Sequence, residues 1–346
     1  MSLPSTGTQR MHQQWPSGGH VPAPARFPTP PVGAPSNVSP VTPLAIRPEV
    51  ADRIATRRPV VALESTIVSH GLPRPDNLAV ARRVEQVVRD NGAVPATVAI
   101  LDGVVHVGLD DDQLSEIAGR DDIGKASVRD LPVVIAAGRC AATTVASTAA
   151  IAARAGIGVF ATGGLGGVHR QARESWDESA DLIALARTSI CVVCSGVKSI
   201  LDVQATLERL ETLGVTVLGY GTHAFPGFYR TDSGHRLDWR VDSPEDVVAV
   251  VRARKELGLP DSAVVVTNPL PEHEQLDPQL HDRVLAEALT AMDESGISGK
   301  DVTPFLLAAF HRQTGGASLR ANVRIIERNA ELAARIAVSA RPPIPA

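Results

Sequence analysis

Short apolar runs alternate with amphipathic segments over most of this chain. The runs at 59–63, 158–162 and 190–194 consist mainly of apolar residues, which is typical of strands buried on both faces. Between such runs, segments such as 77–91 and 200–213 repeat apolar residues with helical spacing. This order of strand, loop and helix predicts an α/β fold in which a mostly parallel sheet is covered by helices.

The same patterns assign the remaining elements. Asp102 and Gly103 mark a tight hairpin between predicted strands. The last third of the chain has mostly helical spacing and could form a cap, but we expect one domain over residues 45–340. The hairpin strands are predicted at 96–101 and 104–107, further strands at 131–137, 216–220 and 263–267, and further helices at 110–118, 143–155, 179–186 and 246–257.

Residues 1–44 differ from the rest in composition. They contain ten prolines among Ser, Thr and Gly residues. Such a segment cannot bury enough apolar surface to offset its loss of conformational entropy. We therefore expect a disordered extension here, and a flexible tail at residues 341–346. A cleaved targeting peptide is the alternative, but the extension lacks the amphipathic periodicity of one.

Composition and charge exclude several classes of function. The chain carries 34 basic and 38 acidic residues and 3% aromatic residues, which favours neither nucleic acid nor an anionic membrane as a partner. Cys191 and Cys194 lie in a predicted strand, where two packed thiols are a better interpretation than a redox pair. Because no apolar stretch is long enough to span a bilayer, we expect a soluble, cytoplasmic protein.

Lys198 follows the apolar run at 190–194 after a short turn formed by residues 195–197. It therefore lies at the C-terminal end of a predicted parallel strand, where open α/β sheets bind their ligands. A lysine that is partly removed from water loses basicity, and its neutral amine can attack carbonyl and sugar carbons. A phosphate contact or a solvated boundary residue is the alternative.

Glu64 has the equivalent position after the strand at 59–63. Burial of a carboxyl at a strand end raises its pKa, which suits a general acid, although Glu64 could instead cap the following turn. The glycine-rich segment 163–167 follows another strand and precedes His169. Its amides could hold a phosphate or a sugar, but it matches no dinucleotide or NTP motif and could be only a tight turn.

Further polar residues lie near predicted strand or helix ends. Thr143 and Thr144 are expected to open a helix, either as N-cap residues or as an anion site. Asp177 and Asp181 have the spacing of one helical turn, which suits a hydrated divalent cation but also arises from the helix dipole alone. Asn268 follows a predicted strand, where its amide could bind a ligand or form an Asx turn.

Taken together, these segments resemble the pseudouridine-5′-phosphate glycosidase family over residues 46–338. Many matches in the same order along the chain are more specific than any one motif. The resemblance is carried by Ala62-Leu63-Glu64-Ser65-Thr66-Ile67, by Thr162-Gly163-Gly164-Leu165-Gly166-Gly167-Val168-His169-Arg170, by Cys194-Ser195-Gly196-Val197-Lys198-Ser199, and by segments at 69–71, 125–132, 141–147, 179–182, 268–272 and 299–319.

This resemblance implies an α/β/α sandwich, usually assembled as a homotrimer, that cleaves pseudouridine 5′-phosphate to uracil and ribose 5-phosphate. By match to the family pattern, Lys198 would be the covalent nucleophile and Glu64 the proton donor. Asp177 would hold a divalent ion, typically Mn²⁺, largely through waters. The substrate would contact Lys125, Val145, Ser179, Ala180 and Asp181, to which we add Thr143, Thr144, His169 and Asn268.

A carbon leaving group requires more than the carboxylate pair of ordinary glycosidases. We expect Glu64 to protonate the ribose ring oxygen and Lys198 to add at C1′ of the opened sugar, so that scission of the C–C bond leaves an imine for hydrolysis. A Schiff-base aldolase or lyase that uses Lys198 is one alternative. A non-catalytic binding protein is another, which the presence of Glu64, Lys125, Asp177 and Lys198 together disfavours.

Overall fold

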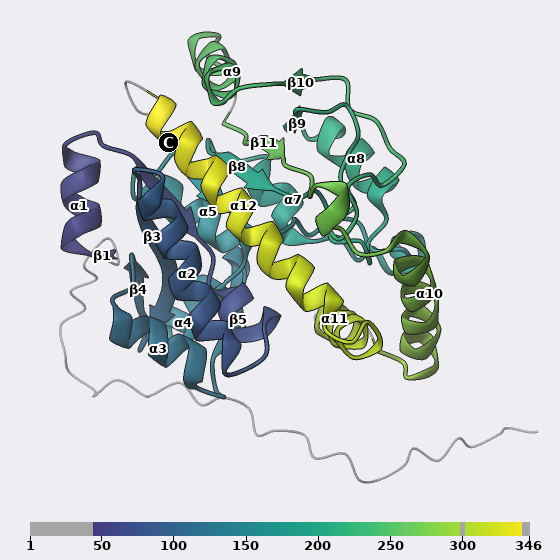
Figure 1. The fold of residues 1–346 in the computed structure, drawn as a ribbon. Coiled ribbons are helices and arrows are strands. Elements are labelled where there is room, and N and C mark those ends of the chain that lie inside the picture. Colours follow the sequence, from purple (N-terminus) through teal and green to yellow (C-terminus); the bar gives the residue numbers. More distant parts are fainter. Residues whose placement is uncertain (1–43, 260, 298–301, 341–346) are drawn as a thin grey trace, which may run out of the picture. The chain divides into compact units, whose positions relative to one another are not determined.

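The described part of the chain is built on one sheet. The computed structural model describes residues 44–259, 261–297 and 302–340. The strands are β1 Ala45–Ile46, β2 Val60–Leu63, β3 Val94–Leu101, β4 Val104–Val107, β5 Gly124–Ala126, β6 Ala141–Thr143, β7 Val159–Ala161, β8 Cys191–Cys194, β9 Thr216–Tyr220, β10 Arg240–Val241 and β11 Val264–Thr267. Their order is β1-β4-β3-β2-β7-β8-β11-β9-β10, with β6 on β3 and β5 on β6 (Figure 1).

Most neighbouring strands run parallel, as predicted. The series β3-β2-β7-β8-β11-β9-β10 is parallel throughout. The long strand β3 changes partners along its length, because Val94–Thr97 pair with β2 whereas Val98–Leu101 pair antiparallel with β4. Asp102 and Gly103 have positive φ angles of 47° and 76° in the turn between β3 and β4, which confirms the predicted hairpin.

Helices cover both faces of the sheet. They are α1 Pro48–Ala55, α2 Asp76–Asp90, α3 Asp111–Gly119, α4 Leu131–Ala136, α5 Val145–Arg154, α6 Ala172–Ser175, α7 Ala180–Leu185, α8 Val203–Thr212, α9 Pro244–Glu256, α10 Pro278–Glu294, α11 Val302–Gln313 and α12 Ala317–Ser339. Because strand side chains alternate between faces, Ala62 packs in the core beneath α5 and α7, whereas Val61 packs beneath α2 and α12. The predicted α/β/α sandwich is therefore confirmed.

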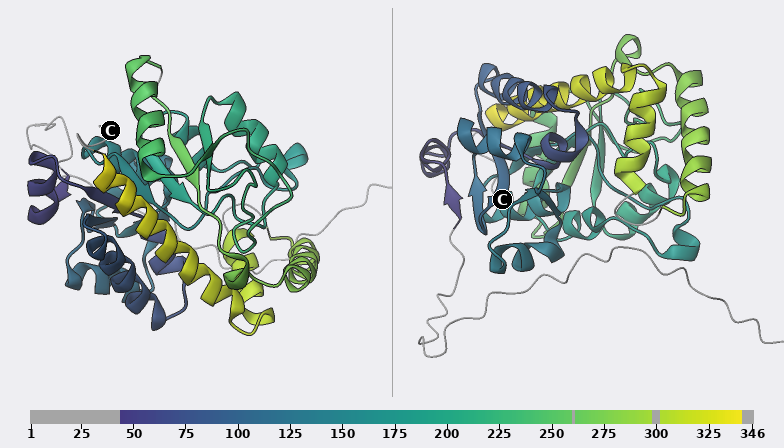
Figure 2. Two further views of the ribbon diagram at one scale, coloured as in Figure 1. Left: turned by 45° about the horizontal axis from the view of Figure 1, so that its top comes forward. Right: turned by 90° about the horizontal axis from the view of Figure 1, so that it is seen from below.

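The C-terminal third is helical, as expected. Helices α10 and α11 pack against each other, and α12 lies across β2, β7 and β8. Both views in Figure 2 show α12, in yellow, running over the sheet. No helix of the described residues is long and apolar enough to cross a membrane. The extension predicted at 1–44 lies, apart from Leu44, outside the described residues, and so does the tail predicted at 341–346.

The prediction of a strand at 131–137 was wrong, because these residues form helix α4. A short apolar run does not by itself distinguish a strand from a helix. Here Pro132 lies in the first turn, where its missing N–H costs no helical hydrogen bond. None of the α4 residues is fully buried, but Leu131, Val134 and Ile135 pack against the core from one face of the helix.

Cys191 and Cys194 are free thiols in β8, as expected for packed cysteines. Each side chain is fully buried, and they lie in the cores on opposite faces of the sheet. Burial raises the pKa of each thiol to about 12. Neither thiol is therefore ionised near neutral pH, and redox chemistry at this pair is disfavoured.

Candidate active site

Four parallel strands bring polar residues to one edge of the sheet. Glu64 follows β2, Thr162 follows β7, Ser195 follows β8 and Asn268 follows β11. These strands are neighbours in the order β2-β7-β8-β11 and share one direction, so the residues after them meet at the carboxyl edge. Ligands bind at this edge in open α/β sheets.

A cavity of about 50 Å³ lies at this edge, and a second space of about 240 Å³ adjoins it. The predicted residues Glu64, Lys125 and Lys198 line the first cavity together. The other lining residues are Thr66, Ile67, His70, Gly71, Gly163, Gly164, Phe228, Leu307 and Asn322, of which His70, Gly71, Leu307 and Asn322 also line the second space. The inner cavity alone is too small for a nucleotide, so a ligand of that size would extend into the adjoining space.

Glu64 is 8% exposed, and its carboxylate accepts a hydrogen bond from the Thr162 hydroxyl. Burial raises the pKa of Glu64, and the positive charge of Lys198 is the strongest opposing effect. The raised pKa favours the protonated form that a general acid needs. The hydroxyl groups of Ser65 and Thr66 donate elsewhere, to the Val98 and Thr143 carbonyls.

Lys198 is half-buried, and its backbone N–H donates to the Leu165 carbonyl at 3.1 Å. Gly196 lies two residues earlier with φ of +80°, and a Cβ there would come within 2.2 Å of the Pro226 carbonyl oxygen. Only glycine fits at this position, so Gly196 fixes the turn that leads from the end of β8 to Lys198.

Lys125 belongs to the short strand β5, rather than to a loop before a strand at 131–137. Its side chain is exposed to solvent and also lines the cavity. Burial lowers the pKa of Lys125, and the charge of Lys198 lowers it further. The charge of Lys198 therefore disfavours the charged form of Lys125, and Glu64 lies near both lysines.

Asp181 is buried and connects two parts of the site. Its two carboxylate oxygens accept hydrogen bonds from the Ala146 N–H at 3.0 Å and the Gly166 N–H at 2.8 Å. A Cβ on Gly166 would lie 2.2 Å from the Ser179 hydroxyl oxygen, so glycine is required for this close approach. The Gly166 amide is therefore occupied by Asp181, whereas Gly163 and Gly164 line the cavity. Substrate contact by Ser179, Ala180 and Asp181 stays a prediction.

Asp177 and Asp181 do not share a helix, because α7 begins at Ala180. The idea that helical spacing places both carboxylates on one face was therefore wrong. Asp177 instead lies beside His169, with 3.7 Å between Oδ2 and Nδ1. Burial lowers the pKa of His169, and the positive charges of Lys198 and Lys125 lower it further. The His169–Asp177 pair is therefore within electrostatic reach of both lysines.

The described residues contain no cluster of three or more His, Cys, Asp or Glu side chains that could hold a metal ion. A single carboxylate at Asp177 is nevertheless compatible with a hard divalent ion that keeps most of its waters. Among the described residues, water would therefore have to fill most coordination positions of an ion held by Asp177.

Other predicted site residues have structural contacts. Thr144 is the N-cap of α5, as expected, and its hydroxyl accepts from the Ser147 N–H, so that Val145 begins the helix. Thr143 instead ends strand β6, with its hydroxyl donating to the Val98 carbonyl. The Asn268 amide donates to the Asn329 side-chain oxygen at 3.1 Å. Contacts of these residues with substrate stay predictions.

Two asparagines of α12 complete the site and were missed from the sequence. Asn329 is fully buried, and its amide donates to the Thr162 carbonyl at 2.8 Å and to the Ser195 hydroxyl at 3.2 Å. Asn322 lines both cavities, and its buried Oδ1 has no hydrogen-bond partner among the described residues. The signal for them was two asparagines seven residues apart, on the buried face of an amphipathic helix.

The chain resembles known proteins over nearly all of its described length. A family model described as indigoidine synthase A like protein matches residues 49–339. The pseudouridine-5′-phosphate glycosidase of Salinispora tropica is 65% identical over 291 residues, which cover 84% of this chain and 90% of that protein. The protein of the same name from Streptomyces griseus is 63% identical over 292 residues, with coverage of 84% and 90%.

Two solved structures have a fold similar to that of this chain. The prealnumycin C-glycosynthase AlnA, in complex with ribulose 5-phosphate, has a TM-score of 0.80 and 37% sequence identity, covering 87% of this chain and 97% of that one. An indigoidine synthase A-like protein from Thermotoga maritima has a TM-score of 0.77 and 37% identity, with coverage of 85% and 95%.

The raised pKa of Glu64 predicts a pH-dependent effect on stability. Its native carboxyl holds a proton more tightly than the unfolded chain does, so this stabilisation is fully present below about pH 4.5 and is lost as the pH rises through the raised pKa. Because glutamine cannot ionise, the free energy of unfolding of Glu64→Gln should increase relative to wild type between pH 4.5 and 8, by about 1.4 kcal/mol for each unit of pKa shift.

Urea unfolding at several pH values measures this difference. Thr162→Val is the matched variant, because it removes a hydrogen bond that lowers the pKa of Glu64 while leaving the carboxyl ionisable. Its stability should fall more steeply with pH than that of wild type. A difference between Glu64→Gln and wild type that is constant over this pH range would contradict the raised pKa.

Proposed function

We propose that this chain, which belongs to the indigoidine synthase A like family, cleaves the C–C glycosidic bond of pseudouridine 5′-phosphate with water, giving uracil and ribose 5-phosphate. The observation that carries this proposal is the meeting of Glu64, Lys125 and Lys198 in one cavity at the carboxyl edge of the sheet. The names of the curated relatives support the choice of substrate.

Glu64 begins the reaction as an acid. In its protonated form it donates a proton to the ribose ring oxygen while the bond between that oxygen and C1′ breaks. The electron pair of this bond stays on the oxygen, and the ring opens. Thr162 orients the carboxyl by donating to it, and burial raises its pKa, which favours the protonated form. The complex of AlnA with ribulose 5-phosphate, an open-chain pentose phosphate, supports an opened sugar.

Lys198 is the nucleophile of the next step. Its neutral amine forms a bond to C1′ and loses a proton. The nitrogen lone pair then forms a C=N bond as the bond between C1′ and uracil C5 breaks, and C5 receives a proton as uracil leaves. Water hydrolyses the resulting imine, which releases ribose 5-phosphate and restores the amine. The same steps in reverse would form the C–C bond.

Lys125 and the start of α5 suit the 5′-phosphate. Strand β5 pairs with β6 directly before α5, so Lys125 and the first turn of this helix lie close together. A lysine and a helix N-terminus both favour an anion. The unpartnered oxygen of Asn322 would accept a hydrogen bond from a uracil N–H at the other side of the cavity. Phosphate and base would thus be held on opposite sides of the C–C bond.

Asp177 is the residue that would hold a divalent ion, with Mn²⁺ as the expected ion. The neighbouring His169 lies within the field of both lysines, so this pair borders the proposed phosphate region. When bound, the ion would supply positive charge that offsets the negative charge of the substrate phosphate. The chain's own contribution is one carboxylate, and water would fill the remaining coordination positions.

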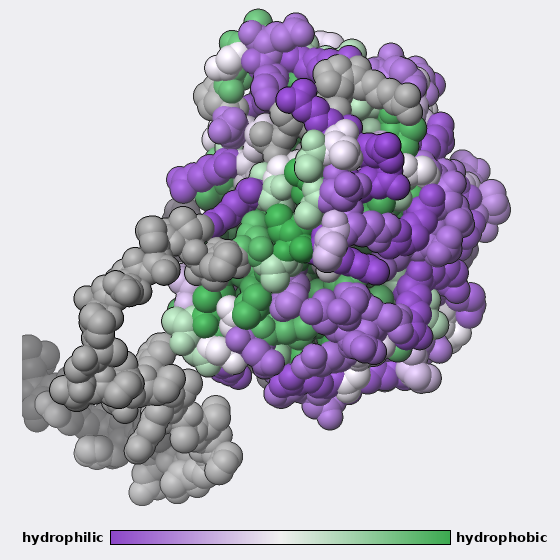
Figure 3. Space-filling view, turned by 90° about the vertical axis from the view of Figure 1, so that its left-hand side faces the viewer, coloured by the Kyte–Doolittle hydropathy of each residue, from purple (hydrophilic) through white to green (hydrophobic). Residues whose placement is uncertain are grey.

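The exposed apolar surface around α4 suits association into a homotrimer. Val133 of α4 is 54% exposed, and Val104 and Val128 are also exposed. Helix α4 packs beside the β3–β4 turn, because a Cβ on Gly103 would meet the Ile135 carbonyl oxygen. Figure 3 shows apolar side chains, in green, gathered on the side of the molecule that carries β1 and β4. An apolar surface of this kind is typical of a protein–protein interface.

Borohydride trapping tests the proposed nucleophile. Wild type is incubated with pseudouridine 5′-phosphate and Mn²⁺, reduced, digested and examined by peptide mass spectrometry. Uracil release and a pentose-phosphate adduct on Lys198 are expected. Both Lys198→Ala and Lys198→Arg should lose activity on the order of 10³-fold or more, because arginine restores the charge but not the nucleophile. Lys125→Ala should keep the adduct on Lys198 and raise KM.

Lys125 is the competing lysine in this experiment. An adduct on Lys125, or near-normal uracil release by a folded Lys198→Ala variant, would overturn the mechanism. Circular dichroism and the thermal midpoint show whether each variant is folded. A folded wild-type protein that releases no uracil would overturn the proposed function itself.

Chelation tests the role of Asp177. After treatment with EDTA, the activity of wild type should fall and should recover as Mn²⁺ is added. Asp177→Asn should require at least about tenfold more Mn²⁺ for the same recovery, because the amide is a weaker ligand than a carboxylate. Asp112→Asn, on the exposed first turn of α3, is the matched control and should follow wild type. Equal Mn²⁺ dependence of both variants would exclude Asp177 as a ligand.

Sedimentation velocity tests the homotrimer and the surface that forms it. Wild type should sediment at about three times the chain mass of 36.4 kDa. Val133→Glu should shift the protein to the monomer, because a buried, unpaired charge destabilises an interface. Leu257→Glu, which changes an exposed apolar residue at the end of α9, is the control and should remain trimeric. A trimeric Val133→Glu would place the interface elsewhere, and a monomeric wild type would reject the trimer.

A further inference from the structure

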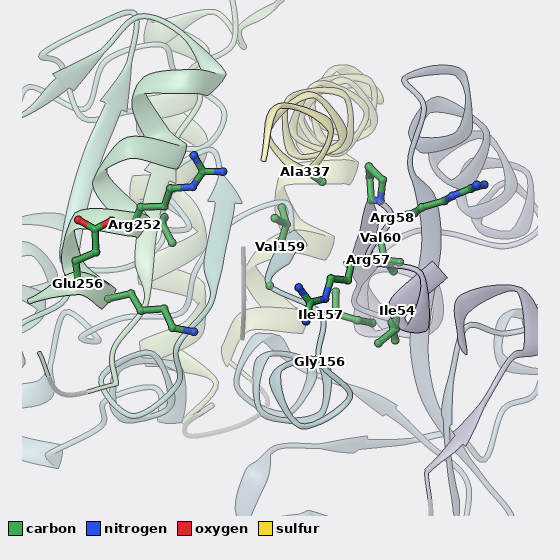
Figure 4. Close-up of a pocket in the computed structure, with 14 residues that line it drawn as sticks. Ile54, Arg57, Arg58, Val60, Gly156, Ile157, Val159, Arg252, Glu256 and Ala337 are labelled. Atoms are coloured by element: carbon green, nitrogen blue, oxygen red, sulfur yellow. The ribbon is translucent and has the colours of Figure 1, made fainter. Parts of the chain in front are cut away.

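A larger cavity lies at the opposite edge of the sheet from the candidate active site. Its volume is about 520 Å³, and its lining includes Val60 at the start of β2 and Val159 at the start of β7. Because these strands are parallel, their first residues lie at the amino edge, whereas Glu64 and Thr162 follow their last residues. The end of α1 forms one wall of this cavity and α9 forms the other (Figure 4).

Positive charge is concentrated in the walls of this amino-edge cavity. Arg57 and Arg58 come from the turn after α1, and Arg252 and Lys255 come from α9. Glu256 is the single acidic residue in the lining. The whole chain has a net charge of −4, so the excess of cations here is a local feature rather than a reflection of composition.

The arrangement of these side chains directs the positive charge into the cavity. Figure 4 shows Arg57 and Arg252 extending toward the space between the two walls, whereas Glu256 points away from it. Within the described part of the chain, neither Arg57 nor Lys255 forms an ion pair. Two side chains with unneutralised charge therefore border a space large enough for an organic ligand.

The backbone at Arg57 adds a second observation. Its φ is 54°, in the left-handed region, where glycine is the usual residue after a helix. The Arg57 N–H donates to the Ile54 carbonyl at 3.1 Å, which fixes this turn at the end of α1. Because a long charged side chain stands where glycine would be the least strained choice, the position suggests a role for the guanidinium.

The floor of the cavity is apolar. It is formed by aliphatic side chains from α1, β2, β7, α9 and α12: Ile54, Val60, Ile157, Val159, Val251 and Ala337. A small inorganic anion would contact the cations but not this floor. A ligand that uses both parts has a phosphate at one end and an apolar ring or base at the other.

We propose that the cavity bordered by Arg57, Arg252 and Lys255 binds an organic phosphate of about nucleotide size, at a site separate from the candidate active site. The Arg57 guanidinium forms paired hydrogen bonds to the phosphate oxygens, the Lys255 ammonium adds a second cation, and the aliphatic floor contacts the base or ring. This site is independent of the reaction proposed for the carboxyl edge, since it shares none of the residues that line that cavity.

Calorimetric titration with ADP, used as the probe, tests this proposal on the full chain. Wild type should bind ADP, and the affinity should fall as salt is added, because phosphate contacts are screened. The double variant Arg57→Glu and Lys255→Glu should bind at least about tenfold more weakly, since it replaces attraction by repulsion. Its thermal midpoint is measured to show that it is folded.

Two controls locate the binding. Arg187→Glu reverses one positive charge at an exposed position outside the cavity and should bind ADP within about twofold of wild type. The double variant Lys125→Ala and Lys198→Ala removes the cations of the carboxyl edge and should also retain ADP affinity. The proposal is overturned if wild type does not bind ADP at millimolar concentration. It is also overturned if Arg57→Glu with Lys255→Glu binds as wild type does, or if only the active-site variant loses binding.

Discussion

The carboxamide of Asn329 holds together the strand ends on which the candidate site is built. Its nitrogen donates to the Thr162 carbonyl after β7 and to the Ser195 hydroxyl after β8, and its oxygen accepts from the Asn268 amide after β11. Parallel strands leave polar backbone groups unpaired where the ladder ends, and such groups are costly when they are buried. One side chain from α12 thus satisfies a backbone carbonyl after β7 and also binds polar side chains that follow β8 and β11. The Thr162 hydroxyl in turn donates to Glu64, and Ser195 begins the turn that leads from β8 to Lys198.

Charged side chains of opposite sign meet in the cavity at these strand ends. Glu64 is buried, with its pKa raised by desolvation, while Lys125 and Lys198 lie close enough to oppose that shift. A carboxyl and two amines that are held near one another without full neutralisation are poised for proton transfer and nucleophilic attack. Asp181 does not share this role, because its oxygens already accept from two backbone amides. Two buried carboxyl groups thus have different environments because their hydrogen-bond partners differ.

Elements whose stabilising contacts leave a pattern in the local sequence could be predicted, whereas elements that depend on distant contacts could not. Strands such as β8 were predictable because a strand buried on both faces requires a continuous apolar run, and the residue after it necessarily reaches the carboxyl edge. Helix α4 was not, because a run of six apolar residues does not by itself distinguish a strand from a helix, even though Leu131, Val134 and Ile135 pack against the core. The short strands β5 and β6 depend on pairing with each other and with β3. Such long-range pairing leaves little trace in a local sequence window.

The candidate site shows the same distinction. Glu64 could be found because it directly follows β2, and Lys198 because only the short turn 195–197 separates it from β8. The spacing of Asp177 and Asp181 was misleading, since the start of α7 at Ala180 is set by the Ser179 cap rather than by the interval between the carboxylates. Asn329 lies 167 residues from the Thr162 carbonyl that it contacts, so no local pattern could relate the two.

Helix α12 presents Asn322 to the cavity and Asn329 to the strand ends, two turns apart on one face. An α-helix rotates by about 100° for each residue, so one inserted or deleted residue between them would turn one asparagine away from its partner. Substitutions on the outer face of this segment leave that phase unchanged. The outer face of this segment can therefore vary in sequence. The number of residues between Asn322 and Asn329 is fixed, because both side chains must reach their places in the site.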